Sequence, residues 1–139
     1  MTILNMRVYV TFCSEKKFPV RYEIPKFLYD SRRIKAFVKR CEASGARFAI
    51  LSGKYGVVWD EERVENYNRW LGDVDEKEYK KLILKVEEKL KGYEVFFYEP
   101  NPHRAKKYRK LLEDAKIKFE SFNKVDFILK NERKNHQAF

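Results

Sequence analysis

Short apolar runs alternate with amphipathic stretches along this chain, and most runs end in polar residues. Runs rich in β-branched and aromatic residues are typical of buried strands. Four such strands are expected, at residues 8–12, 47–52, 93–98 and 116–122. Apolar residues at helical spacing predict three helices between them, at residues 31–44, 75–91 and 101–115. This order predicts one α/β domain over residues 1–139, with a mostly parallel four-stranded sheet and helices on both faces.

Four other segments have no clear period. Residues 18–30 contain two prolines and are expected to form an ordered loop across the sheet edge. The polar passage 53–75 is long for a compact domain, which favours a functional lid. Residues 125–130 fit a final helix or a short strand, and we favour the helix. The polar residues 131–139 are expected to fray.

The composition narrows the class of partner. Of the 139 residues, 44% are hydrophobic and 16% aromatic, which is enough for one hydrophobic core. Lys and Arg outnumber Asp and Glu by 31 to 21, and the excess occurs in both halves of the chain. A net charge of +10 favours anionic partners such as nucleic acids, nucleotides and phosphates. The abundance of Lys and Glu is also typical of proteins from hot environments.

The two cysteines exclude several protein classes. Cys13 and Cys41 are too few and too far apart for a zinc motif or a disulfide-rich secreted fold, so reduced thiols are expected. Cys41 falls on the apolar face of the first helix and is predicted to be a core residue. No apolar run approaches the length of a signal sequence or a membrane span. We therefore expect a soluble cytoplasmic protein that uses no metal and no cofactor.

Two of the predicted strands end in polar and cationic residues. The first leads into Cys13, Ser14 and Lys17, and the second into the segment Ser52-Gly53-Lys54-Tyr55-Gly56. Ligands bind at the carboxyl ends of strands in open α/β sheets, so both segments are expected to line one crevice. The second segment lacks the P-loop spacing, and nucleotide hydrolysis of that kind is not expected.

Each of these candidates also has a structural interpretation. Cys13 beside cationic side chains fits a nucleophile, or a small residue that closes the strand. Ser14 fits a hydrogen-bond donor to a ligand, or a turn residue. Lys17 and Lys54 supply positive charge, and a partly buried lysine with a lowered pKa can act as a nucleophile. Gly53 and Gly56 let the backbone bend around a ligand, or make a tight turn.

Aromatic, histidine and cationic residues extend the candidate site. Tyr55 and Tyr67 offer flat faces on which a base can stack, with Tyr67 expected to close over it; such residues also pack loops onto a core. His103 follows the third strand and fits an acid or base, or a structural role at a helix start. Two uninterrupted cationic stretches on predicted helices fit either a phosphate-backbone track or solvated helix faces. Their singled-out residues are Arg32, Arg33, Arg104, Lys107 and Lys110.

Several separated motifs together resemble the uncharacterised YaaA-like domain family, over about residues 6–120. The motifs are Cys13-Ser14-x-x-Lys17, Leu28-Tyr29-x-Ser31, Ile50-Leu51-Ser52-x-Lys54-Tyr55-Gly56-Val57-Val58 and Asn66-Tyr67-Asn68-x-x-Leu71. A related pattern occurs in the middle domain of archaeosine synthase, which acts on a deazaguanine base in transfer RNA. That domain resembles this chain at Cys13 and Lys17, but continues Lys-Pro-Tyr where this chain has Lys17-Phe18-Pro19. The resemblance implies an α/β fold related to uracil-DNA-glycosylase-like domains, with a crevice for a nucleobase or nucleotide.

The sequence is compatible with three functions. The first, which we favour, is a domain that recognises a nucleobase or nucleotide in tRNA or DNA modification; as an enzyme it would exchange a base or form a base adduct. The second is a non-catalytic DNA- or RNA-binding protein that uses the two cationic stretches. The third is an accessory module that pairs with a separate catalytic chain.

Overall fold

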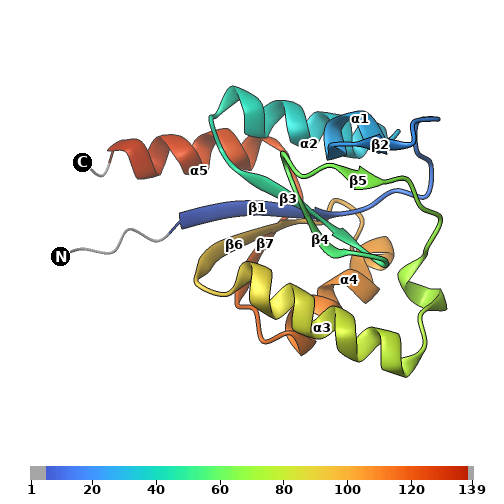
Figure 1. Cartoon of the computed structure of the whole chain (residues 1–139). Helices are drawn as coiled ribbons and strands as arrows, with labels where there is room; N and C mark the ends of the chain where they lie inside the picture. The colour runs from blue at the N-terminus through green and yellow to red at the C-terminus, as the bar shows by residue number, and fades with distance from the viewer. Residues whose placement is uncertain (1–5, 138–139) are drawn as a thin grey trace.

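Five of the strands form one sheet with helices on both faces, and two short strands form a separate pair (Figure 1). The computed structural model describes residues 6–137, with side chains up to residue 135. The strands of this sheet are β1 (Met6–Phe12), β3 (Phe48–Ser52), β4 (Gly56–Trp59), β6 (Tyr93–Tyr98) and β7 (Phe119–Phe122). Their order is β4-β3-β1-β6-β7, and neighbours run parallel except β4, which is antiparallel to β3. The predicted α/β class with a mostly parallel sheet is confirmed.

The expected number of four strands is wrong, because the chain folds back directly after β3. Ser52 pairs with Gly56, so residues 53–55 form the loop of a hairpin. Gly56 has a φ of +77°, a backbone conformation that favours glycine. Val57 and Val58 then complete the sheet edge and are fully buried. These two apolar residues are too few to distinguish a strand from the polar passage around them.

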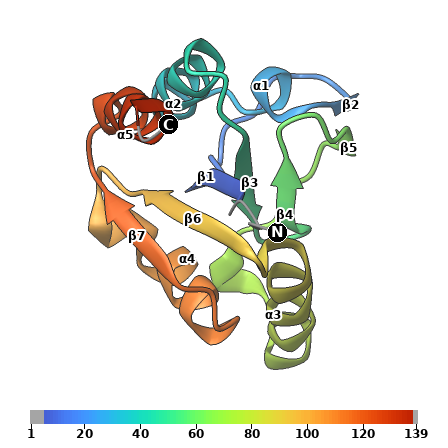
Figure 2. The ribbon, with the colours of Figure 1, turned by 90° about the vertical axis from the view of Figure 1, so that its left-hand side faces the viewer.

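Two long helices cover each face of the sheet (Figure 2). They are α2 (Arg32–Ala43) and α5 (Asp126–Gln137) on one face, and α3 (Glu76–Leu90) and α4 (Pro102–Asp114) on the other. Successive residues of a strand point to opposite faces, so the sheet divides the core into two clusters. Tyr9 belongs to the α2 cluster, whereas Val8 and Val10 belong to the α3 and α4 cluster.

The three helices predicted between strands begin where a side chain caps them. Ser31, Asp75 and Asn101 each accept a hydrogen bond from the backbone nitrogen three residues later, which satisfies a free donor of the first turn. Cys41 on α2 is fully buried, as predicted for a core residue. Among residues 6–137, no helix has the length and apolar character needed to cross a membrane.

Residues 18–30 are more regular than the loop expected from the sequence. They contain the short strand β2 (Tyr22–Glu23) and the one-turn helix α1 (Pro25–Leu28). β2 pairs antiparallel with β5 (Val64–Glu65), a partner more than forty residues away along the chain. A two-residue strand has no visible period, so only the folded structure identifies it.

The passage 53–75 is also more regular than expected. It contains β4, β5 and the 3₁₀ helix η1 (Leu71–Asp73). The Asn66 side chain donates hydrogen bonds to the carbonyl oxygens of Phe18, at 3.0 Å, and Val20, at 2.7 Å. The two passages therefore hold each other in place across the sheet edge.

The C-terminal segment is helical rather than frayed. α5 continues through Gln137, and residues 138–139 lie outside the described part of the chain. The Tyr9 hydroxyl donates to the Glu132 carboxylate at 2.7 Å and accepts from the Asn131 side chain at 2.9 Å. Arg7 also pairs with Glu132, at 2.8 Å. These polar residues anchor the helix to β1. The prediction of fraying rested on their polarity alone and did not include these contacts.

Candidate functional site at the carboxyl edge of the sheet

The candidate site lies where the strand order reverses. From β1 the chain passes through α2 to β3 on one side, and β6 then pairs with β1 on the other side. In open α/β sheets such a reversal leaves a crevice at the carboxyl ends of the two strands. The Thr11 hydroxyl of β1 donates to the carbonyl oxygen of Tyr98 at the end of β6, at 2.9 Å, and so ties the two strand ends together.

Arg33 reaches over these strand ends from the first turn of α2. Its guanidinium donates to the Thr11 hydroxyl and to the carbonyl oxygen of Phe12, both at 2.7 Å, and lies 3.7 Å from the centre of the Phe12 ring. Burial lowers the pKa of Arg33 to about 10, and the nearby Arg104 acts in the same direction. No carboxylate among the described side chains forms an ion pair with Arg33. A positive charge is therefore held at the edge by neutral acceptors.

Cys13 is half-buried directly after β1. Its backbone nitrogen donates to Leu51 of β3, at 2.9 Å, and its side chain packs against both core clusters. The Cys13 sulfur lies 3.2 Å from the Tyr108 hydroxyl of α4. Burial, the largest cause, raises the pKa of Tyr108 well above its usual value. Cys13 thus closes the strand and also contacts a polar group of the edge, the Tyr108 hydroxyl.

Lys17 bends back over the edge and contacts two tyrosines. Its ammonium group lies 4.3 Å from the centre of the Tyr67 ring and 5.9 Å from that of Tyr29, and donates to the carbonyl oxygen of Ser14 at 3.1 Å. Burial lowers the pKa of Lys17, and the neighbouring Cys13 opposes this. The Ser14 hydroxyl donates to the carbonyl oxygen of Lys16 within the same turn, at 2.7 Å. In this arrangement Ser14 has a turn contact, whereas Lys17 is the half-buried cation.

The segments after β1 and β3 converge on Tyr67. The Tyr67 hydroxyl lies 2.7 Å from that of Tyr29, and its ring meets the Tyr55 ring edge to face at 5.3 Å. Burial raises the pKa of Tyr67 far above its usual value, and a side-chain hydrogen bond with Ser52 opposes this. The Ser52 oxygen also accepts from the backbone nitrogen of Lys54, at 3.1 Å. Only 8% of Tyr67 is exposed, so the ring is a wall of the site.

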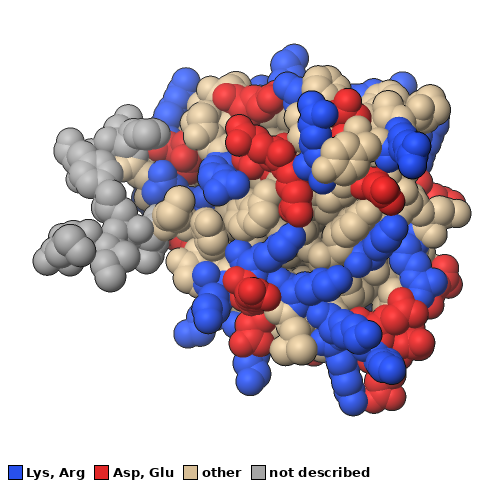
Figure 3. Space-filling view, viewed as in Figure 1, with Lys and Arg blue, Asp and Glu red and all other residues tan. Residues whose placement is uncertain are grey.

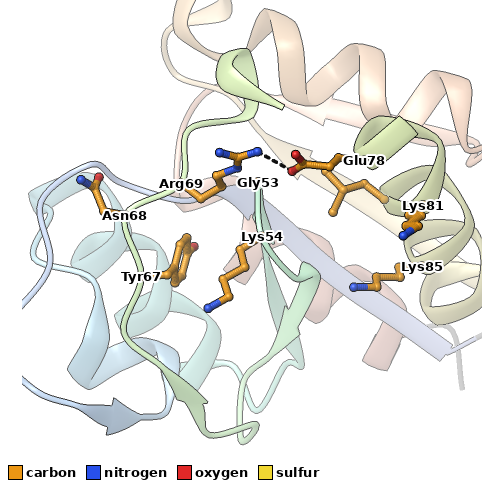
Figure 4. Close-up of a pocket in the computed structure, with 9 residues that line it drawn as sticks. Gly53, Lys54, Tyr67, Asn68, Arg69, Glu78, Lys81 and Lys85 are labelled. Carbon is orange, nitrogen blue, oxygen red and sulfur yellow. Dashed lines mark hydrogen bonds and ion pairs between the residues drawn. The ribbon is translucent and has the colours of Figure 1, made fainter. Parts of the chain in front are cut away.

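A pocket of about 480 Å³ adjoins this wall (Figure 4). Three segments surround it: the β3–β4 turn, residues 67–69 and the first half of α3. Its lining residues are Gly53, Lys54, Tyr67, Asn68, Arg69, Glu78, Lys81, Leu82 and Lys85. Four of these are cationic and one is acidic, and Arg69 and Glu78 form an ion pair across the pocket.

The two glycines of the β3–β4 turn set the shape of this pocket. A Cβ on Gly53 would lie 2.8 Å from the backbone nitrogen of Leu71 and 2.9 Å from the carbonyl oxygen of Arg69. A Cβ on Gly56 would lie 3.2 Å from that of Lys85. The turn therefore fits closely between the 69–71 backbone and α3, and this packing fixes the distance between the pocket walls.

The sequence matches the model of DUF6884, a family of unknown function, over residues 8–134. The chain belongs to this family. The match confirms the expectation of an uncharacterised family and spans both segments of the candidate site. No curated protein matches the chain. Among solved structures, a de novo designed Rossmann-fold protein is similar at 15% identity and a TM-score of 0.38, with 94% of this chain and 97% of that one covered.

In this member of DUF6884 the two cationic stretches lie on opposite faces of the sheet. Arg32 is exposed on α2, whereas Arg33 of the same turn points into the edge. Arg104, Lys107 and His103 are exposed on α4, and Lys110 pairs with Asp114 at 2.6 Å. The stretches approach each other at the helix N-termini, where Arg104 lowers the pKa of Arg33.

Three cations of the pocket are absent from the sequence-based prediction. They are Arg69, Lys81 and Lys85. The spacing of Lys81 and Lys85, four residues apart, is visible in the sequence, but it equally fits the solvated face of an amphipathic helix. Only the packing of α3 against Gly56 turns that face toward a pocket. Among the described side chains, no group of three or more His, Cys, Asp or Glu residues is placed to hold a metal ion.

Proposed function

We propose that this domain binds a nucleobase or nucleotide at the carboxyl edge of its sheet and acts in nucleic-acid modification. The observation that carries the proposal is the convergence of the 13–17 and 52–56 segments on Tyr67, beside a cationic pocket. The pocket has one aromatic side chain in its lining, Tyr67, and several convergent polar groups. Concave sites with a few convergent polar groups are where small molecules usually bind. Its positive charge favours an anionic ligand.

The candidate reactive groups are Cys13 and Lys17. Burial lowers the pKa of Lys17, which increases the fraction of neutral amine available as a nucleophile or proton acceptor. Arg33 donates to the carbonyl oxygen of Cys13 at 3.3 Å, and its charge would stabilise an anionic group on a ligand bound beside Cys13. Lys54 is exposed at the tip of the hairpin and serves as a charged contact to the ligand.

The YaaA-like resemblance of the same segments supports this proposal. The motif residues Tyr29, Ser31, Asn66 and Tyr67 have structural contacts around the site: Ser31 caps α2, and Asn66 joins the two edge passages. By this resemblance the fold is proposed to be related to uracil-DNA-glycosylase-like domains. Where archaeosine synthase domains continue Lys-Pro-Tyr, this chain has Phe18 and Pro19, so we propose a related ligand class rather than the same reaction.

Direct binding measurements test the proposal. A panel of free bases, nucleosides, nucleoside monophosphates, transfer RNA and duplex DNA is titrated by calorimetry against the wild type and the Lys17→Met, Lys54→Met double variant, at low and moderate salt. We expect saturable, base-dependent binding that the double variant loses. The matched control replaces Lys91 and Lys118, exposed lysines that precede β6 and β7 at the opposite edge, and should retain binding. Full affinity in the Lys17, Lys54 variant would refute the proposal.

The second candidate, a basic nucleic-acid-binding protein, is favoured by the exposed cations Arg32, Arg104 and Lys107. It predicts binding of polymers alone, with affinity that falls steeply with salt and little base preference. Reversing the charge of Arg104, Lys107 and Lys110 would then weaken binding far more than changes at Lys54. A domain that binds neither nucleotides nor nucleic acid but copurifies with another chain would favour the accessory module.

A further inference from the structure

The pocket beside Tyr67 carries an excess of positive charge that the fold itself does not neutralise. Its lining has Lys54, Arg69, Lys81 and Lys85 against the single carboxylate of Glu78. The Arg69–Glu78 ion pair accounts for one charge of each sign. Lys and Arg side chains also gather more widely over α3, as Figure 3 shows. The residues that line the pocket therefore carry a net positive charge.

The three lysines of the pocket differ from their neighbours on α3. Lys80 pairs with Glu76, and Lys89 pairs with Glu62. Among the described side chains, no carboxylate forms an ion pair with Lys54, Lys81 or Lys85. Lys81 and Lys85 are also one helical turn apart, a spacing at which like charges destabilise a helix. An anion bound between them would remove that cost.

The cations come from segments that pack closely against one another. Figure 4 shows Lys54 on the β3–β4 turn, Arg69 on the following passage, and Lys81 and Lys85 on α3, around one hollow. The backbone at Gly53 and Gly56 lies so close to residues 69–71 and to α3 that an added Cβ would be crowded, so the fold sets the backbone positions of all four cations. The backbone that carries the charges is therefore in place before a ligand arrives. Lys54, Lys81 and Lys85 are exposed, so ordering their side chains on a ligand still costs rotamer entropy.

We propose that this pocket binds the phosphate group of the ligand, so that the domain recognises a nucleoside phosphate in preference to a free base or nucleoside. The inference rests on the proposed function for the base, which would lie across Tyr67 toward Lys17. Phosphate oxygens accept several charge-assisted hydrogen bonds at once, which suits a cluster of ammonium groups and one guanidinium. Arg69 keeps N–H donors beyond those that face Glu78.

The test measures binding of inorganic pyrophosphate, a nucleoside and its monophosphate to the wild type and to the Lys81→Gln, Lys85→Gln double variant. Glutamine keeps most of the length of the side chain and removes the charge. We expect the variant to lose about tenfold or more in affinity for pyrophosphate and for the monophosphate, with nucleoside affinity unchanged. The matched control is the Lys80→Gln, Lys91→Gln variant, which loses the same charge outside the pocket lining and should bind like the wild type.

The outcomes separate this inference from the proposed function. Equal affinity for nucleoside and monophosphate, unchanged in the Lys81, Lys85 variant, overturns the phosphate site and leaves a base site. Pyrophosphate binding lost in the variant, without any binding of nucleosides or nucleotides, would show an anion site in the pocket but would overturn both the nucleoside phosphate as its ligand and the proposed function. Absence of pyrophosphate and monophosphate binding overturns the inference. A further arm adds transfer RNA as a competitor of the monophosphate. Displacement of the monophosphate would mean that the pocket accepts phosphodiesters within a polynucleotide, and no displacement would mean that it takes only the phosphate of a free nucleotide.

Discussion

The Gly53→Ala substitution tests whether the candidate site depends on the close approach of two backbone segments. The added methyl would lie 2.8 Å from the Leu71 nitrogen and 2.9 Å from the Arg69 oxygen. Backbone atoms cannot rotate aside as a side chain can, so the hairpin loop must move away from the 69–71 passage. Such overpacking costs about 1–3 kcal/mol. Restricting the unfolded chain returns about 0.4–1 kcal/mol.

The difference predicts a net loss of about 1–2 kcal/mol in the free energy of unfolding. For a domain of this size that loss lowers Tm by about 3–6 °C. Thermal and urea unfolding, followed by circular dichroism, measure both quantities. Because Gly53 also lines the pocket, displacement of the turn should weaken monophosphate binding as well.

The Gly72→Ala substitution is the matched control. Its added methyl would lie 2.5 Å from the ring of Trp70, an exposed side chain (56%) whose ring lies 5.8 Å from the Lys107 ammonium group and can shift, unlike a backbone. Neither glycine has a positive φ, so alanine strains neither backbone. We expect Gly72→Ala to change stability by about 0.5 kcal/mol or less. Wild-type stability in Gly53→Ala, or a larger loss in Gly72→Ala, would refute the reasoning from backbone contact.

Three further perturbations test the fold and the edge. Replacing Tyr9 by Phe should lower the free energy of unfolding by about 1–3 kcal/mol in urea titrations, because the hydroxyl bonds to the buried Glu132; the same change at the exposed Tyr22 should be neutral. Replacing Arg33 by Lys should cost a similar amount, because an ammonium cannot reproduce the planar contacts to the strand ends, whereas Arg32→Lys should be silent. The free energy of unfolding should fall above about pH 10, because buried tyrosines keep protons that the unfolded chain releases. Each such tyrosine lowers it by up to about 1.4 kcal/mol per pH unit. The tyrosines in which burial raises the pKa are Tyr9, Tyr29, Tyr67, Tyr79, Tyr98 and Tyr108. A urea midpoint that stays flat between about pH 9 and pH 11 would contradict this.

The sequence predicts those parts of the fold in which local pattern and burial agree. The long helices have both an apolar stripe and a side-chain cap, as at Asp75 of α3, and the central strands are continuous apolar runs. β4 and β2 are too short, at two to four residues, to show a long apolar run in the sequence. They are stabilised mainly by pairing with a neighbouring strand. α5 is polar along its second half and is held by contacts of Glu132 to β1, which arise only in the tertiary structure.

The candidate site also has a part that the sequence predicts and a part that only the folded structure shows. The carboxyl ends of parallel strands meet at one edge, so the proximity of Cys13 and Ser52 follows from the order of strands and helices. The roles of Tyr67 and Arg69 do not, because they depend on how the passage after β5 returns across that edge. Arg33 shows a further limit: one helical turn contains an exposed arginine and a half-buried one, and the cationic stretch alone does not distinguish them.

The placement of charge brings the two leading functions to the same surface. α2 and α4 cover opposite faces, so a nucleic acid in contact with both cationic stretches would have to cross the strand-end edge where Arg33 and Arg104 approach each other. That edge adjoins Cys13 and Lys17. A polymer bound there would present its bases to the same side chains that a free nucleotide would contact. The two functions therefore share this edge, and they differ in their dependence on salt, on phosphodiester length and on the α4 cations relative to Lys54; those are the quantities that decide between them.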